Sequence, residues 1–443
     1  MKAYREHHFI KDSFYTTIFT VIGKAVGYLI PFFIAAWFGV NENIDVFFYS
    51  YGVMFFLTMI FSNSVENIIV PIVSDHKHNY SNEKLEYLIG RLMILILGGL
   101  AFVLIITFLL SKKIFSVITN FSSYQINILN IYFLEFIPFT FFLCSSSFLN
   151  GILNAYKKFW VPALSPAVRA VVCIIIIYIL KNDCGVHSII IGYNIGELSR
   201  LLLLILYIVH RKLFKFRFDF KFDKEIIDVF IRVSFLMIST LIVGMNPLVD
   251  NSFASWLPVG SISLLEYTNK LVAIPYNFIT FGFLTVFLSH LSDDLYKYGF
   301  ERFKKNFYNY LRPILAGVST ITLVLIFLSK YIVNLCFGIG GRIPMEALRS
   351  IDILYIISMI GFIPYIIIQV FVRGFLALKA TRYLLYVSII KFILNILLDA
   401  YLVRKFGING IMLASTILNY ILLIVVYVFF KNLSSVNKLK SSL

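Results

Sequence analysis

Residues 248–271 read LVDNSFASWLPVGSISLLEYTNKL, a stretch that keeps charged residues such as Asp250 and Lys270 among apolar ones. Its middle part, FASWLPV at residues 253–259, resembles an earlier segment, IAAWFGV at residues 34–40. A charge in apolar surroundings and a repeated segment both require a structural explanation. Together they predict a chain built from two similar lobes with a polar space between them.

The composition identifies an integral membrane protein. Of 443 residues, 60% are hydrophobic and 14% are charged, and the mean hydropathy is +0.87. Soluble globular domains carry about 25% charged residues. The four cysteines are scattered without C-x-x-C spacing, so neither a metal knuckle nor a disulfide framework is indicated.

Apolar windows of about 20 residues, long enough to cross a bilayer, predict an all-α polytopic protein with twelve transmembrane helices. The windows lie near residues 12–38, 45–72, 86–110, 127–154, 159–180, 188–209, 226–253, 262–289, 313–333, 350–376, 383–403 and 408–430.

The net charge is +16, and the positively charged residues are distributed unevenly between the two sides of the predicted membrane topology. Most loop lysines and arginines fall in the N-terminus, the even-numbered loops and the C-terminal tail. The positive-inside rule therefore places both termini in the cytoplasm. We expect this charge to contact anionic lipid headgroups, and not nucleic acid.

Internal similarity divides the helices into two groups of six. Three pairs of segments align at nearly equal offsets: Trp37 with Trp256 at 219, FLNGILNAY (148–156) with FVRGFLALK (371–379) at 223, and GVHSI (185–189) with GINGI (407–411) at 222. An even number of helices returns each half to its starting side, as in parallel repeats that enclose a central cavity.

The predicted domains are an N-lobe at residues 1–210 and a C-lobe at residues 226–443. The basic linker RKLFKFRFDFKFDKE, residues 211–225, alternates phenylalanine with charge. It is either an amphipathic segment on the cytoplasmic membrane surface or a solvated tether.

Ionisable side chains inside the spans are candidates for function, because each costs roughly 2.5 to 3.5 kcal/mol at the centre of a helix. Lys24 lies in the middle of the first span without an acidic partner one turn away, so a role in substrate binding is favoured. Glu197 and Arg200 are three residues apart and can pair along one helix face.

A second polar group lies near the C-terminus. Asn395 and Asp399 are four residues apart and share a helix face, and Ser415 and Thr416 supply hydroxyls on the next helix. Oxygen ligands suit a hard cation, whereas polar residues one turn apart also hold helices together. No constellation of catalytic residues is present, so an enzyme is not expected.

Several segments resemble the MurJ (MviN) family of lipid II flippases, within the superfamily that includes multidrug exporters and polysaccharide flippases. In the first half they are IAAWFG followed by Asp45, Phe47 and Phe48; IIVPIVSD (68–75); and GILNAYKKFWVPALSP (151–166). In the second half they are residues 248–271, FGFLTVFLSHLS (281–292) and RGFLALKATR (373–382).

The resemblance implies a flippase that carries an undecaprenyl-diphosphate-linked sugar by alternating access. Lys24 stands where the family has a cavity arginine, and Asp45 and Asp250 match its acidic positions. Other family arginines are replaced by Ile30, Leu57, Thr58 and Asn251, and the family's two further C-terminal helices have no counterpart here. These departures favour a glycan other than lipid II.

Ionisable positions and the resemblance together define the candidate site. The substrate-binding candidates are Lys24, Asp45, Glu66, Arg169, Asp250, Asn251, Asn269 and Lys270. Some family members have a cation site on the helices that correspond to the seventh, eleventh and twelfth spans, so Asn395, Asp399 and Ser415 or Thr416 would bind a monovalent cation, with Na⁺ as a coupling ion. Asp228 is the candidate acid from the seventh span.

Two other functions are consistent with the sequence. A cation-coupled multidrug exporter would have acidic cavity walls, whereas inward-facing Lys24, Lys270 and Arg169 favour an anionic substrate. A membrane scaffold that holds glycan-synthesis enzymes without transporting anything would tolerate the loss of Lys24 and Lys270.

Overall fold

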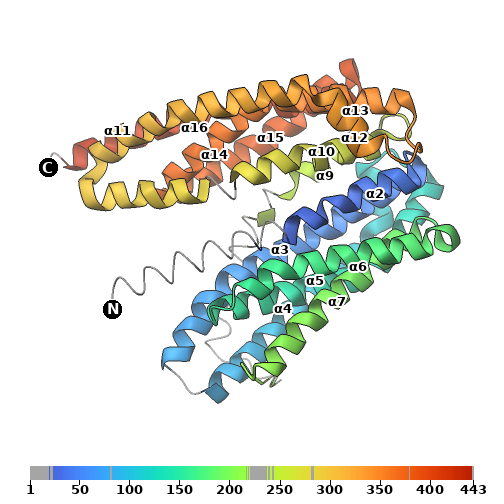
Figure 1. Ribbon diagram of the computed structural model, residues 1–443, viewed down its shortest axis with the longest axis horizontal. Helices are drawn as coiled ribbons and strands as arrows, with labels where there is room; N and C mark the ends of the chain where they lie inside the picture. Colours follow the sequence, from blue (N-terminus) through green and yellow to red (C-terminus); the bar gives the residue numbers. More distant parts are fainter. Residues whose placement is uncertain are drawn as a thin grey trace. The chain divides into compact units, whose positions relative to one another are not determined.

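The computed structural model describes residues 19, 23–79, 82–215, 217, 219, 237, 240–241, 244–280, 284–378 and 380–441. Within these ranges the secondary structure is helical, and no residue is in a strand. The all-α class predicted from the sequence is therefore confirmed. Figure 1 shows the helices in chain order.

The chain divides into two compact units, Met1–Leu248 and Val249–Leu443. The lobe boundaries predicted at residues 210 and 226 do not coincide with this division, and they stay predictions. Most of the linker 211–225 lies outside the described residues, as does Asp228. The described part of the linker contacts the first unit, because Arg91 pairs with Asp219 at 2.7 Å and the amide of Lys215 donates to Glu86 at 2.9 Å.

The first unit is a bundle of long helices. They are α2 (Leu29–Phe38), α3 (Glu42–Asn79), α4 (Asn82–Ile118), α5 (Ser123–Ala155), α6 (Trp160–Cys184) and α7 (His187–His210). The first of these continues a helical segment that begins at Gly23. Helices α3 and α5 pack along each other, as do α6 and α7.

The second unit combines several short helices with the longest described one. Helix α9 (Asn246–Ala254) crosses the unit boundary and is followed by α10 (Ser261–Phe278), α11 (Leu284–Phe327), α12 (Ser329–Phe337), α13 (Met345–Ile360), α14 (Phe362–Ala377), α15 (Thr381–Phe406) and α16 (Ile408–Ser441). Helix α11 has a kink at Gly299, where φ is +75°. Helices α15 and α16 form an antiparallel pair (Figure 1).

The described residues contain eight helices long and apolar enough to cross a membrane, or nine if the bent pair α13 and α14 counts as one span. The first and seventh predicted spans lie partly outside the described residues. The eighth corresponds to α10, whose Glu266 and Lys270 reduce its mean hydropathy. Helices α3 and α4 extend beyond the predicted windows, because the polar residues that flank the apolar windows are also helical.

Two glycines at aligned positions of the repeat have nearly the same backbone conformation. Gly185 has φ +53° and ψ −133°, and Gly407 has φ +57° and ψ −135°. Each lies in the short turn between two consecutive helices. Only glycine adopts this conformation without strain. The shared turn is structural support for the internal repeat at offset 222.

The tenth predicted span, residues 350–376, is not one continuous helix. It breaks at Gly361, and α13 and α14 meet at 42°. Pro364 cannot donate to the carbonyl of Ile360, and the Tyr420 hydroxyl does so instead at 3.3 Å. Asn419 donates to the carbonyl of Gly361 at 3.3 Å. The Tyr420 side chain thus satisfies the carbonyl that Pro364 leaves without its usual donor.

Candidate functional site

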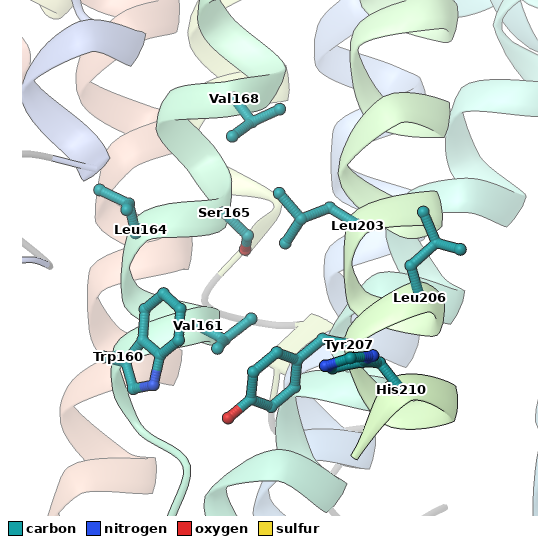
Figure 2. Close-up of a pocket in the computed structure, with 9 residues that line it drawn as sticks. All are labelled: Trp160, Val161, Leu164, Ser165, Val168, Leu203, Leu206, Tyr207 and His210. Carbon is teal, nitrogen blue, oxygen red and sulfur yellow. The ribbon is translucent and has the colours of Figure 1, made fainter. Parts of the chain in front are cut away.

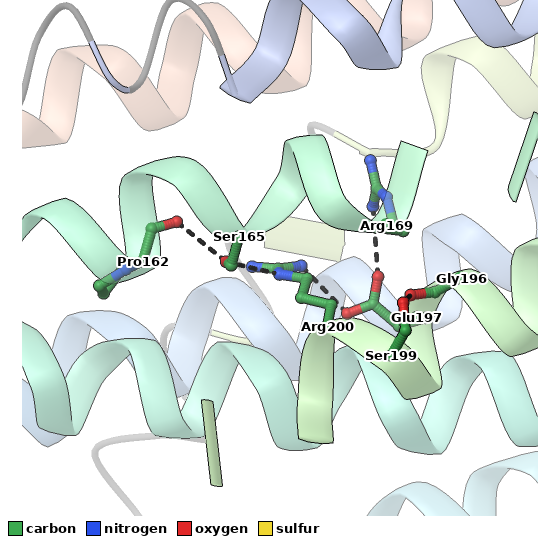
Figure 3. Close-up of polar contacts among 7 residues, drawn as sticks. All are labelled: Pro162, Ser165, Arg169, Gly196, Glu197, Ser199 and Arg200. Carbon is green, nitrogen blue, oxygen red and sulfur yellow. Dashed lines mark hydrogen bonds and ion pairs between the residues drawn. The ribbon is translucent and has the colours of Figure 1, made fainter. Parts of the chain in front are cut away.

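A buried charge cluster joins α6 and α7 in the first unit (Figure 3). Glu197 is fully buried, and its two carboxylate oxygens face Arg200 at 3.1 Å and Arg169 at 3.4 Å. The Arg200 Nε atom donates to the Ser165 hydroxyl at 3.0 Å, and that hydroxyl donates to the carbonyl of Pro162 at 3.1 Å. We call Ser165, Arg169, Glu197 and Arg200 the arginine cluster.

Small residues allow the two helices to approach closely at this cluster. A Cβ atom on Gly196 would lie 2.6 Å from the carbonyl oxygen of Arg169, and one on Gly192 would lie 2.7 Å from the Ile177 side chain. This close packing sets Glu197 directly against α6. The predicted pairing of Glu197 with Arg200 is confirmed.

Arg169 is the more exposed of the two arginines in the arginine cluster. Its side chain is 22% exposed, compared with 7% for Arg200. It also approaches the helix that carries Lys24, since its Nη2 atom lies 3.9 Å from the position of a Cβ on Gly27. Because two guanidinium groups share one carboxylate, the cluster keeps an excess positive charge. Such a charge can bind a phosphate group.

A second cluster lies in the other unit, between α9 and α15. The side-chain amide of Asn395 donates to Asp250 and to Asp399, both at 3.0 Å. Asn395 and Asp399 are buried, with 1% and 0% exposure. Lys391, one turn before Asn395, interacts electrostatically with Asp250. We call Asp250, Lys391, Asn395 and Asp399 the aspartate cluster.

The predicted residues next to this cluster form their own contacts. Asn251 is buried and donates to Glu266 at 3.0 Å, and Lys270 pairs with the same carboxylate at 3.6 Å. The charge of Lys270 is therefore partly offset, although its side chain is 32% exposed. Asn269 is half-buried on α10.

Two oxygens of the aspartate cluster are buried without a donor among the described residues: Asn395 Oδ1 and Asp399 Oδ1. Buried oxygens of this kind fit a bound cation or water. Thr416 was expected to contribute as well. Its hydroxyl donates to the carbonyl of Ile357 at 2.9 Å and so joins α16 to α13. Its role as a cation ligand stays a prediction. Ser415 is half-buried on α16.

The remaining predicted residues lie in the first unit. Lys24 is half-buried on the helical segment before α2. Asp45 is 5% exposed in the first turn of α3, where a negative charge is stabilised by the helix N-terminus. The Glu66 side chain lies outside the described residues.

Sequence reasoning missed the partner of Asn395. The candidate acid was placed at Asp228, which lies outside the described residues, whereas the acid that contacts Asn395 is Asp250, near the other end of the same predicted span. Asp250 had been assigned to substrate binding instead. The two residues are 145 positions apart, so no local pattern could join them.

Comparisons with known proteins fit this architecture. The family model described as "Lipid II flippase MurJ" matches residues 34–442. The lipid II flippase MurJ of Thermosipho africanus is 26% identical over 407 residues, covering 90% of this chain and 81% of that protein.

Solved structures share the fold. A structure of lipid II flippase MurJ in an inward closed conformation has a TM-score of 0.79 and 24% identity, covering 95% of this chain and 87% of that one. An inward-facing multidrug resistance MATE family transporter has a TM-score of 0.79 and 12% identity, covering 95% of each chain. Because the family model matches nearly the whole sequence, this chain belongs to the lipid II flippase MurJ family.

Proposed function

We propose that this protein moves a polyprenyl-diphosphate-linked sugar from the inner to the outer leaflet of the bacterial cytoplasmic membrane by alternating access. The match of the family model to residues 34–442 carries this proposal. Both termini are then cytoplasmic, as the distribution of positive charge predicts.

The arginine cluster supplies chemistry that such a substrate needs. A diphosphate cannot enter hydrocarbon without compensation of its charge. Arg169 is partly exposed and is anchored by Glu197, so its guanidinium is oriented before a ligand arrives. Lys24, on the neighbouring helix, adds a second cation. An arginine can grip a phosphate with two hydrogen bonds, whereas a lysine acts as a point charge.

The departures from the family pattern bear on which glycan is carried. Ile30, Leu57 and Thr58 replace family arginines and are buried, with 2%, 8% and 0% exposure. These positions belong to the packed interior of the first unit. A pathway with fewer cations favours a polysaccharide repeat unit, with lipid II as the alternative substrate.

The aspartate cluster supports coupling to a monovalent cation such as Na⁺. Asp399 and Asn395 would be the ligands, together with Asp250, and the cation would offset the crowded carboxylates. Among the described residues, no group of three or more His, Cys, Asp or Glu is placed to hold a metal ion. A weakly bound alkali cation agrees with that finding better than a transition metal does.

The test is replacement of the native flippase in a bacterium whose own lipid II flippase can be depleted. Survival, with labelled lipid II reaching the outer leaflet, identifies lipid II as a substrate. Failure there, together with export of a capsule or O-antigen unit in a strain lacking its polysaccharide flippase, identifies a polysaccharide precursor. Failure in both strains, despite normal protein levels, contradicts the proposal.

Variants connect transport to the proposed cations. We expect Arg169→Gln and Lys24→Ala each to reduce translocation strongly. Lys113→Ala is the matched control, because Lys113 is exposed near the C-terminal end of α4. Normal glycan export by the double variant Lys24→Ala and Lys270→Ala would instead favour a scaffold for glycan-synthesis enzymes.

A multidrug exporter is the second candidate, favoured by the shared fold of the MATE transporter and by the acids of the aspartate cluster. Ethidium efflux from vesicles that contain the purified protein distinguishes the two functions. Efflux that depends on Asp250 and not on Arg169 would support the exporter.

A further inference from the structure

A groove runs between α6 and α7 on the first unit (Figure 2). Its volume is about 320 Å³. The lining side chains are mostly hydrocarbon and come from the first half of α6 and the second half of α7. They are Trp160, Val161, Leu164, Ser165, Val168, Leu203, Leu206, Tyr207 and His210.

The groove follows from how the two helices pack. Close approach occurs at Gly192 and Gly196, against the middle and second half of α6. The lining segments 160–168 and 203–210 contain no glycine. Bulky side chains such as Trp160 and Tyr207 hold the surfaces apart there, and the rings of these two residues meet edge to face at 5.6 Å.

The groove opens onto an apolar surface of the first unit. Trp160 is 46% exposed and Leu206 is 66% exposed, on helices apolar enough to span a bilayer. An apolar surface on such helices is suited to contact with lipid hydrocarbon. Trp and Tyr side chains favour the depth of the lipid headgroups, so Trp160 and Tyr207 mark the end of the groove that lies near the membrane surface.

Basic residues surround that end. Lys157 and Lys158 precede α6, and Arg211 and Lys212 follow α7, and all four are exposed. The Arg211 guanidinium lies 5.9 Å from the centre of the Tyr207 ring. An apolar groove with basic residues at one end is complementary to a lipid with an anionic headgroup.

We propose that this groove binds one hydrocarbon chain of an anionic phospholipid, whose phosphate is held by Arg211 and Lys212. The wall of the groove includes Ser165, the hydroxyl that accepts from Arg200. The bound lipid thus packs against the outer side of the arginine cluster. This inference does not depend on which substrate is transported.

Tryptophan fluorescence tests the proposal directly, because Trp160 lines the groove and the chain has only three tryptophans. Trp37→Phe and Trp256→Phe leave Trp160 as the sole emitter. In vesicles, brominated phosphatidylglycerol should quench Trp160 more strongly than brominated phosphatidylcholine at equal mole fraction. A protein that retains only Trp256, which is 61% exposed outside the groove, should show no such preference.

Two pairs of variants test separately the contacts of the lipid headgroup and those of its hydrocarbon chain. Arg211→Gln with Lys212→Gln should weaken the apparent affinity for brominated phosphatidylglycerol roughly fivefold per charge. The exposed pair Lys112→Gln with Lys113→Gln is the charge-matched control and should have no effect. Leu206→Phe narrows the groove and should reduce quenching by the anionic lipid, whereas Leu109→Phe, on an equally lipid-facing part of α4, should not.

Three outcomes would overturn the proposal. Equal quenching by the two lipids would remove the headgroup preference, and unchanged quenching in Leu206→Phe would place the lipid elsewhere. Recovery of fluorescence on addition of unlabelled polyprenyl phosphate, but not of phosphatidylglycerol, would assign the groove to a polyprenyl chain. Native mass spectrometry of the unmodified protein in mixed-lipid nanodiscs, where phosphatidylglycerol should be retained preferentially, covers the case of a misfolded variant.

Discussion

The two polar clusters differ in the sign of their excess charge. In the arginine cluster, two guanidinium groups share the carboxylate of Glu197. In the aspartate cluster, two carboxylates share the amide of Asn395, and Lys391 is the nearby cation. The first arrangement suits an anionic ligand and the second suits a cation. Similar lobes can thus acquire opposite functions through a few side chains.

Removal of the shared carboxylate should produce the largest effect on stability. Glu197→Gln removes the carboxylate charge that Arg169 and Arg200 share, and Arg200 is only 7% exposed. We expect a loss of about 3 to 5 kcal/mol in the free energy of unfolding, measured by reversible denaturation in detergent. Glu83→Gln is the control, since that carboxylate is 64% exposed in its pair with Arg217. Equal effects of the two substitutions would contradict the role of burial.

The turn glycines test whether the lobes are structurally equivalent. Gly185→Ala and Gly407→Ala each place a Cβ on a backbone with positive φ, and each should cost roughly 1 to 3 kcal/mol. Thermal unfolding of the two variants should give similar shifts. Gly98→Ala is the control, because that helical glycine has free space around it and alanine favours a helix. A large effect at only one turn would break the equivalence.

The bend between α13 and α14 distinguishes the second unit from the first. Thr416→Val removes the hydroxyl that donates to Ile357, and we expect a loss of about 1 kcal/mol. The same substitution should leave cation dependence of transport unchanged if the hydroxyl only joins helices. Loss of cation dependence would restore Thr416 as a ligand.

Neutralising one acid of the aspartate cluster should give the smallest change in stability, and the opposite sign. Asp399→Asn removes a carboxylate that lies near Asp250 in a buried setting, so unfolding should become harder by roughly 1 kcal/mol or less. Cation dependence of transport should be lost at the same time. A destabilisation as large as that of Glu197→Gln would mean that Asp399 neutralises Lys391 and does not repel Asp250.

Much of the fold could be predicted because it is encoded locally. Apolar windows located the helices, and the pairing of Glu197 with Arg200 follows from a three-residue spacing on one helix. The break between α13 and α14 is not encoded by hydropathy alone. The break at Gly361 depends on Pro364 and also on Asn419 and Tyr420, which lie far along the chain in α16. Their side chains donate to the carbonyls of Gly361 and Ile360.

The candidate site was predicted only in part. Asn395 and Asp399 were grouped by their four-residue spacing, and their contact is confirmed, whereas the contact of Asp250 with Asn395 was not foreseen. Asp250 contacts Asn395, and Lys270 pairs with Glu266. A charge in an apolar segment indicates that a partner exists, without saying which residue it is.

The sequence by itself determined that the chain is a helical membrane protein with a duplicated plan, because hydropathy and turn glycines act through neighbouring residues. Only the tertiary structure decided which charges meet, where α6 and α7 separate into a groove, and which carbonyls the hydroxyls of α16 satisfy. Those outcomes depend on the close approach of helices at positions such as Gly196, and contacts between distant residues leave no periodic trace in the sequence.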